Sequence, residues 1–327
     1  MHRAAWELIR GAAARWYEDN ISRHASSLAF YTALSIAPLL VIAIAVAGMA
    51  FGEEAATHEV SRQLRDLLGP AAADTVEEAV RNAAARESNG ILASALGIAL
   101  LVWAATNVFA SLQDSLNTVW GVKPRPDVGI VNTVRIRFLS FTLVLAIAFL
   151  LLVSLLASAA ISALNRVFSG GAAEELAWRA ANLGVSVVVF TAVFAMIFKV
   201  LPDVRVQWRD VWVGAALTAA LFAAGKSLIG LYLGHSSAAS IYGAAGSMVV
   251  LLLWVYYSSQ ILFFGAEFTQ VYAARYGRRI VPDSHAVAVS EEARAREGIP
   301  HRDTVEQATR EHDRRERDRR GALGGRT

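Results

Sequence analysis

The sequence predicts an all-α integral membrane protein with six transmembrane helices. Hydrophobic residues make up 55% of its 327 positions and charged residues only 18%. Soluble domains average about 45–50% apolar and about 25% charged residues, and the mean hydropathy here is +0.41. The charges also concentrate between long apolar runs and after the last of them. The absence of cysteine excludes disulfides and thiolate metal sites.

Six apolar runs are long enough to cross a membrane, since a helix needs about 20 residues to span about 30 Å of hydrocarbon. Their approximate bounds are 28–51, 91–110, 138–164, 183–200, 211–233 and 244–266, within a transmembrane domain of residues 27–277. On the side of the N-terminus, the segments 1–26, 111–137, 199–209 and 275–279 carry fourteen Lys and Arg residues, and the segments on the other side carry six. The positive-inside rule therefore places both ends of the chain in the cytoplasm.

The segments outside the spans divide into three kinds. Residues 1–26 place apolar and aromatic side chains at helical spacing between arginines, which predicts an amphipathic helix in the membrane interface. Residues 52–90 show helical periodicity broken at Gly69-Pro70, which predicts two short helices on the outer face, either a packed loop or a lid. Residues 278–327 mix charges of both signs with few apolar residues, which predicts a disordered or solvated helical tail in the cytoplasm.

Lys226 is the one cation in the apolar run 214–234. It follows Trp212 by fourteen residues, about 21 Å along a helix, so it lies in the outer half of its span. A lysine that snorkels to the outer interface is one explanation. The other is a lysine that faces the bundle, because small residues share its face. That face comprises Ala215, Thr218, Ala219, Phe222 and Gly230.

Polar side chains also form stripes in three other spans, all in the cytoplasmic half. They predict either a shared polar cavity or hydrogen-bonded packing between helices. The stripes comprise Ser27, Tyr31, Ser35 and Pro38 in the first span, Asn107, Ser111, Asp114 and Thr118 with Asn117 beside them at the end of the second, and Tyr256, Gln260 and Glu267 in the last. Pro38 would open the hydrogen-bond ladder of its helix, as a hinge or as a kink.

Enzyme signatures are missing from the sequence. The seven histidines are scattered, and there is no H-E-x-x-H, P-loop or G-x-S-x-G motif. We therefore expect no enzymatic activity, no catalytic residues, no metal and no cofactor.

Five stretches resemble one known family, the YihY/virulence factor BrkB family of bacterial inner-membrane proteins, which has also carried a ribonuclease BN label. They are HASSLAFYTALSIAPLL at 24–40, VWAATNVFASLQDSLNTVWGV at 102–122, LPDVRVQWRDVWVGAAL at 201–217, GKSLIGLYL at 225–233 and YGAAGSMVVLLLWVYYSSQILFFGAEFTQVYA at 242–273. The resemblance covers about residues 10–277 and implies six transmembrane helices in the bacterial inner membrane. It implies little chemistry, although its motifs include Lys226 and the polar stripes.

Three functions remain open at this point. The first is a transporter or lipid-translocating protein, with membrane lipids as partners, an anionic lipid among them, and with Lys226 attracting the anionic headgroup. The second is a non-transporting scaffold for envelope assembly, with a homo-oligomer or an envelope protein as its partner. The third is a membrane ribonuclease, which lacks the His and Asp ligands that a catalytic metal would need. A nucleic-acid partner is not expected, because a net charge of +3 is too small to indicate one.

Overall fold

The structure is a computed structural model, and it describes residues 2–68, 70–86, 91–125, 172–235, 246–277, 280–290 and 294. Helices dominate these residues, as the sequence predicts. The third predicted span, 138–164, and residues 295–327 of the predicted tail lie outside the described residues.

The N-terminal half consists of five helices. They are α1 (His2–Glu18), α2 (Ile21–Phe51), α3 (Glu53–Leu68), α4 (Pro70–Arg86) and α5 (Ile91–Val119). Asn20 turns the chain between α1 and α2 with a φ of 52°, a left-handed conformation that asparagine tolerates well. Gly52, with a φ of 88°, makes the next sharp turn. Proline at the start of α4 suits the first helical position, whose N–H has no partner within the helix.

The rest of the described chain combines three long helices with four short strands. The helices are α7 (Ala172–Val200), α8 (Trp208–His235) and α10 (Gly246–Tyr276). The strands are β1 (Val122–Pro124), β2 (Val204–Arg205), β3 (Val281–Pro282) and β4 (Ala286–Ala288). Strand β1 pairs antiparallel with β4, and β2 pairs antiparallel with β3.

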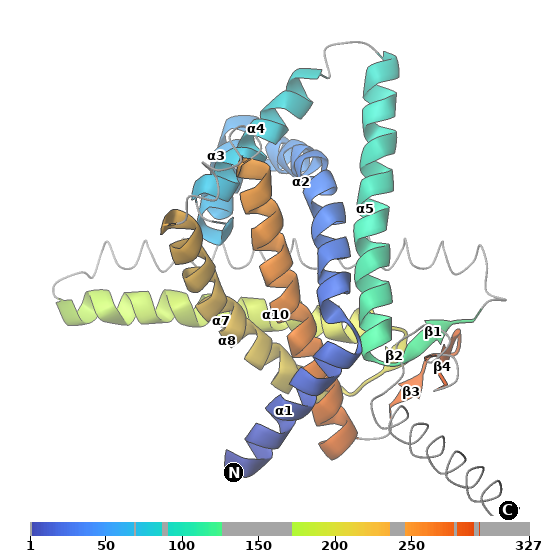
Figure 1. Ribbon diagram of the computed structural model, residues 1–327. Coiled ribbons are helices and arrows are strands. Elements are labelled where there is room, and N and C mark those ends of the chain that lie inside the picture. Colours follow the sequence, from blue (N-terminus) through green and yellow to red (C-terminus); the bar gives the residue numbers. More distant parts are fainter. Residues whose placement is uncertain are drawn as a thin grey trace, which may run out of the picture.

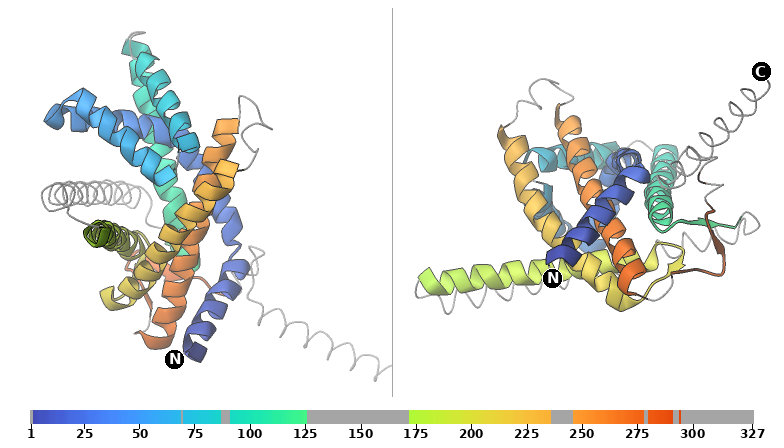
Figure 2. Two further views of the ribbon diagram at one scale, coloured as in Figure 1. Left: turned by 90° about the vertical axis from the view of Figure 1, so that its left-hand side faces the viewer. Right: turned by 60° about the horizontal axis from the view of Figure 1, so that its bottom comes forward.

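Helix α10 is central, because it packs against α1, α2, α4, α5 and α8. Figure 1 shows α2, α5 and α10 running in a common direction, with α3 and α4 at one end and α1 and the strands toward the other. Helix α7 packs against α8 but lies across this direction, and Figure 2 shows it nearly end-on after a quarter turn. The largest buried cluster joins α2, α5, α7, α8 and α10 around Leu116, Phe198 and Phe263.

The predicted spans 28–51, 91–110, 183–200, 211–233 and 244–266 are helical wherever the structure describes them. Among the described residues, Leu183–Val200 and Met248–Tyr276 are long and apolar enough to cross a membrane. The count of six transmembrane helices stays a prediction. The predicted pair of outer helices corresponds to α3 and α4, which begin and end on either side of position 69.

The predicted tail is wrong in one respect. Residues 281–288 are neither disordered nor helical, since they contain β3 and β4. Composition alone did not reveal this, because short strands gain their hydrogen bonds from distant partners, here the backbones of β1 and β2.

Candidate functional site

Lys226 is exposed on α8, whereas the sequence favours a side chain turned toward the bundle. Its small neighbours Ala215, Thr218 and Ala219 are buried as predicted. Contact with α10 is made instead by Gly225, where an added Cβ would lie 2.6 Å from the Ile261 side chain.

The polar stripes of α2 and α5 meet at one point. Ser111 Oγ donates a hydrogen bond of 3.4 Å to Ser27 Oγ. Other stripe residues bond to their own helix, with Ser35 donating to the Thr32 carbonyl and Asn107 to the Trp103 carbonyl. Tyr31 is half-buried beside Phe30, Asp114 is exposed, and α2 continues as a helix through Pro38.

Asn117, at the end of α5, belongs to a buried hydrogen-bond cluster around Asp203. Its amide Nδ2 donates to Asp203 Oδ2 at 2.9 Å, and the Asp203 backbone N–H donates to Asn117 Oδ1 at 2.8 Å. Gln113 Nε2 donates to Asp203 Oδ1 at 3.1 Å, and His285 Nε2 lies 2.8 Å from the same oxygen. This cluster joins α5, the segment before β2 and the β3–β4 turn, so Asn117 has a packing role.

Sequence reasoning missed Asp203, although it lies within the quoted LPDVRV stretch. The β3–β4 turn that contacts it is held by a second aspartate, Asp283. Burial alone would raise the pKa of Asp283, but the Ser284 backbone N–H and the Arg205 guanidinium outweigh burial and lower that pKa below its ordinary value. Asp283 is therefore ionised at neutral pH and accepts both hydrogen bonds.

Helices α8 and α10 interlock through two matching motifs, Gly-Ala-Ala-Leu-Thr at 214–218 and Gly-Ala-Glu-Phe-Thr at 265–269. A Cβ added at Gly214 would lie 1.8 Å from Thr269 Oγ1, and one at Gly265 would lie 1.8 Å from Thr218 Oγ1. Each threonine covers the glycine of the other helix while its hydroxyl donates to the glycine carbonyl of its own. Glycine and threonine four residues apart are the sequence signal that predicts such close packing.

Glu267 lies inside the second of these motifs and is fully buried. Both of its carboxyl oxygens lack a hydrogen bond among the described residues. The charged groups that act on it are Asp19, Arg15 and Arg294. Arg294 Nη2 donates to Asp19 Oδ1, and both of these side chains are buried. Sequence reasoning missed Asp19 and Arg294, since nothing local links positions 275 residues apart.

Gln260 lies on the same face of α10 as Glu267, seven residues earlier. Among the described residues, it hydrogen-bonds to α1 and not to the polar residues of α2 or α5. Its Oε1 accepts a hydrogen bond of 3.1 Å from the Trp16 indole. On α2, His24 Nδ1 lies 3.1 Å from Ser115 Oγ of α5. Burial lowers the pKa of His24 below its ordinary value, and the carboxylates of Asp114 and Asp19 offset only part of this effect. His24 is therefore neutral at pH 7.

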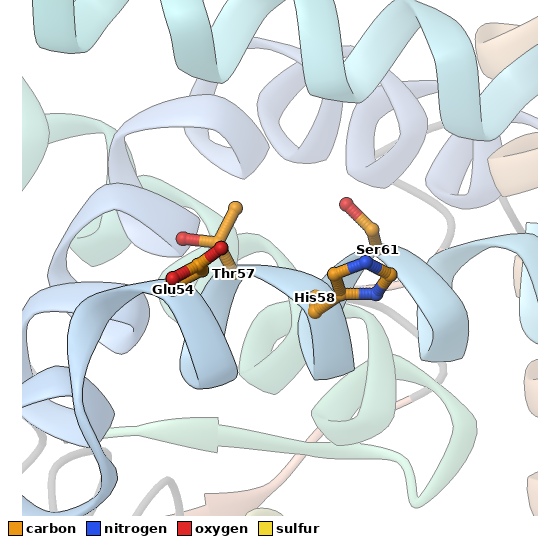
Figure 3. A pocket seen from close by; sticks show the side chains of 4 residues that line it. All are labelled: Glu54, Thr57, His58 and Ser61. Atoms are coloured by element: carbon orange, nitrogen blue, oxygen red, sulfur yellow. The ribbon is translucent and has the colours of Figure 1, made fainter.

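A cavity of about 510 Å³ lies on α3. Figure 3 shows its lining side chains, Glu54, Thr57, His58 and Ser61, all from α3. An exposed ion pair links α3 and α4, with Arg65 Nη2 2.7 Å from Asp74 Oδ1 and 3.1 Å from Glu77 Oε2. Over the described parts of the chain, no three His, Cys, Asp or Glu side chains are grouped so that they could hold a metal ion.

A mostly helical structure with two helices, within the part of the chain that is described, long and apolar enough to cross a membrane is typical of a helical membrane protein. A sequence profile of the family described as virulence factor BrkB matches residues 12–289, so the chain belongs to that family. The resemblance seen in the sequence is thereby confirmed.

Several relatives are named as UPF0761 membrane proteins. One from Rhodospirillum centenum is 31% identical over 270 residues, which cover 80% of this chain and 56% of the relative. One from Halorhodospira halophila is 28% identical over 78% of this chain and 55% of its own length. One from Pseudoalteromonas translucida is 28% identical, over 78% of this chain and 82% of the relative. The chain thus spans little more than half the length of the first two. No solved structure matches it.

Proposed function

We propose that this protein is a non-enzymatic transporter or lipid-translocating protein of the bacterial inner membrane, and that it handles an anionic lipid. In this proposal both ends of the chain lie in the cytoplasm. Helix α1 and the strands then face the cytoplasm, and α3 and α4 lie on the outer side, in keeping with their separation in Figure 1.

The exposure of Lys226 is the observation that carries the proposal. Helix α8 has 28 residues, a length of about 42 Å, and the exposed residues described near this position, Ala224 and Leu228, are apolar, with Leu228 62% exposed. A lysine on a lipid-facing helix surface costs about 2.5–3.5 kcal/mol at the bilayer centre unless its head reaches water or a partner. A lipid phosphate is a partner that the surrounding medium supplies. Lys226 is thus suited to hold an anionic headgroup against α8.

The scaffold function is supported by a different observation. Asn117 and Gln260, two predicted members of a polar path, are engaged in packing contacts with Asp203 and Trp16. Polar side chains used only to join helices are what a protein without a translocation path would need. A scaffold of this kind would co-purify with an envelope protein bound at α3 and α4 or at the C-terminal segment. The ribonuclease function is the least supported of the three.

Native mass spectrometry of protein extracted with its surrounding lipid tests the proposal. We expect the unaltered protein to retain one class of anionic lipid and Lys226→Met to lose it. Leu228→Met is the matched control, because it alters an exposed residue of the same helix without removing a charge, and it should retain the lipid. Equal and non-selective lipid in all three proteins would contradict lipid handling, and a protein partner retained by all three would favour the scaffold.

A further inference from the structure

Glu267 is a fully buried carboxyl group on α10, the central helix of the fold. Its side chain is 0% exposed, and neither carboxyl oxygen has a hydrogen bond among the described residues. A buried carboxylate without hydrogen bonds is strongly unfavourable, and such a group commonly takes up a proton and becomes neutral. Its surroundings therefore favour the acid form over the anion unless a cation pairs with it.

One of the two cations that act on Glu267 is shared with another carboxylate. Asp19, at the α1–α2 turn, is 2% exposed and accepts a hydrogen bond from Arg294, which is 5% exposed. Arg15, on α1, is the other cation that acts on Glu267. Two carboxylates beside each other in a low-dielectric site resist being ionised together, and a single shared proton relieves their repulsion.

Other elements packed against α10 contribute charged groups that lie farther from Glu267. His24 on α2 and the exposed Asp114 on α5 interact with each other, and His24 also interacts with Asp19. Asp210 of α8 lies against Gly277, ten residues beyond Glu267 and about 15 Å along α10. His24, half-buried and neutral, thus lies within electrostatic range of both the exposed Asp114 and the buried Asp19.

We infer that Asp19 and Glu267 form a proton-binding site, loaded from the cytoplasm by way of Asp114 and His24. One proton from cytoplasmic water passes to the His24 imidazole and on to the carboxylate pair, where Glu267 becomes the neutral acid. Its release returns one proton to water and leaves the Glu267 carboxylate. The proton site itself does not depend on the proposed transport function. Only the role of the proton as the ion coupled to transport rests on that function.

Infrared difference spectroscopy of the full chain in lipid nanodiscs, recorded over a pH titration without any transported substrate, tests the site directly. A protonated carboxyl group has a C=O stretch that a carboxylate lacks and that shifts in heavy water. We expect one such band to appear as pH falls and to be absent from Glu267→Gln. Glu78→Gln, the same change at an exposed glutamate of α4, should leave the band unchanged.

Two further variants keep the test decisive. Glu267→Asp retains a carboxyl group, so the band should persist with a changed pH midpoint even if Glu267→Gln does not fold. His24→Phe should leave the band in place but slow its appearance after a pH jump. A band unaffected by both Glu267 variants, or one that does not titrate at all, would overturn the proton site. Loss of lipid selectivity with an intact titrating band would instead refute only the proposed lipid function.

Discussion

Replacing Gly265 with alanine should force α8 away from α10. The added Cβ would lie 1.8 Å from Thr218 Oγ1 and 2.8 Å from Thr218 Cβ, both shorter than any normal contact. Thr218 cannot avoid the clash by rotation alone, because its Cβ stays in place whatever the rotamer. The two helices must therefore separate or shift along each other, and the packing around Thr218 and Ala219 must loosen.

The expected destabilisation has three contributions. Overpacking of a well-packed interior costs about 1–3 kcal/mol. Displacing the Thr218 hydroxyl from the Gly214 carbonyl, a hydrogen bond of 2.7 Å, costs about 0.5–1.5 kcal/mol more. Alanine in a helix interior regains about 0.5–1 kcal/mol relative to glycine. The net loss should be about 1–3 kcal/mol, measured as a lower unfolding free energy in detergent.

Gly184→Ala supplies the matched control, because it makes the same change in α7 where an added Cβ meets nothing within 4 Å. That variant should be neutral or slightly stabilising. Thr218→Gly combined with Gly265→Ala removes every atom that the new Cβ would strike, so the double variant should lose less stability than the two single changes added together. Equal stability of Gly265→Ala and Gly184→Ala would refute the interlock.

Three further changes probe other parts of the structure. Asp203→Ala should lower the free energy of unfolding by about 3 kcal/mol, because it removes a carboxylate acceptor and leaves buried donors unpaired. Arg205→Ala, which breaks an exposed ion pair, should lower it by less than about 1 kcal/mol. The pKa of His24 in the folded protein lies below its value in the unfolded chain, which is about 6.5. The free energy of unfolding should therefore be full above the unfolded pKa and fall as the pH drops toward the folded pKa. His24→Phe should abolish this His24-linked dependence on pH, as measured by unfolding at pH 8 and pH 5.5. Arg65→Ala breaks only an exposed contact between α3 and α4 and should leave the thermal unfolding midpoint unchanged, so a large drop would show that these two helices are held together by that contact.

The helices are predictable because their signals are local. An apolar run of about 20 residues, or an apolar face with a period of 3.6, reports the helix from a single segment of the chain. The break at Gly69-Pro70 likewise identifies two short helices, α3 and α4, from neighbouring residues alone. The orientation and the number of membrane crossings depend on the surroundings of the whole chain and remain predictions.

The polar contacts are less predictable because their partners are far apart in sequence. Asn117 is recognisable as a polar residue on a helix, yet its partner Asp203 lies 86 residues away. Asp19 and Arg294, separated by 275 residues, show no relation in the sequence. For Lys226 the wheel of small residues identifies the buried positions Ala215, Thr218 and Ala219 of α8, but the lysine itself is exposed.

Movement of an anionic lipid between the two leaflets is the most direct test of the proposed function. Liposomes holding the purified protein and a fluorescent phosphatidylglycerol would be treated with an impermeant quencher, which reports how fast inner-leaflet lipid reaches the outside. We predict exchange faster than in protein-free liposomes, lost in Lys226→Met and retained in Leu228→Met. Exchange no faster than in protein-free liposomes, or equal in the two variants, would contradict a lipid-translocating role for Lys226.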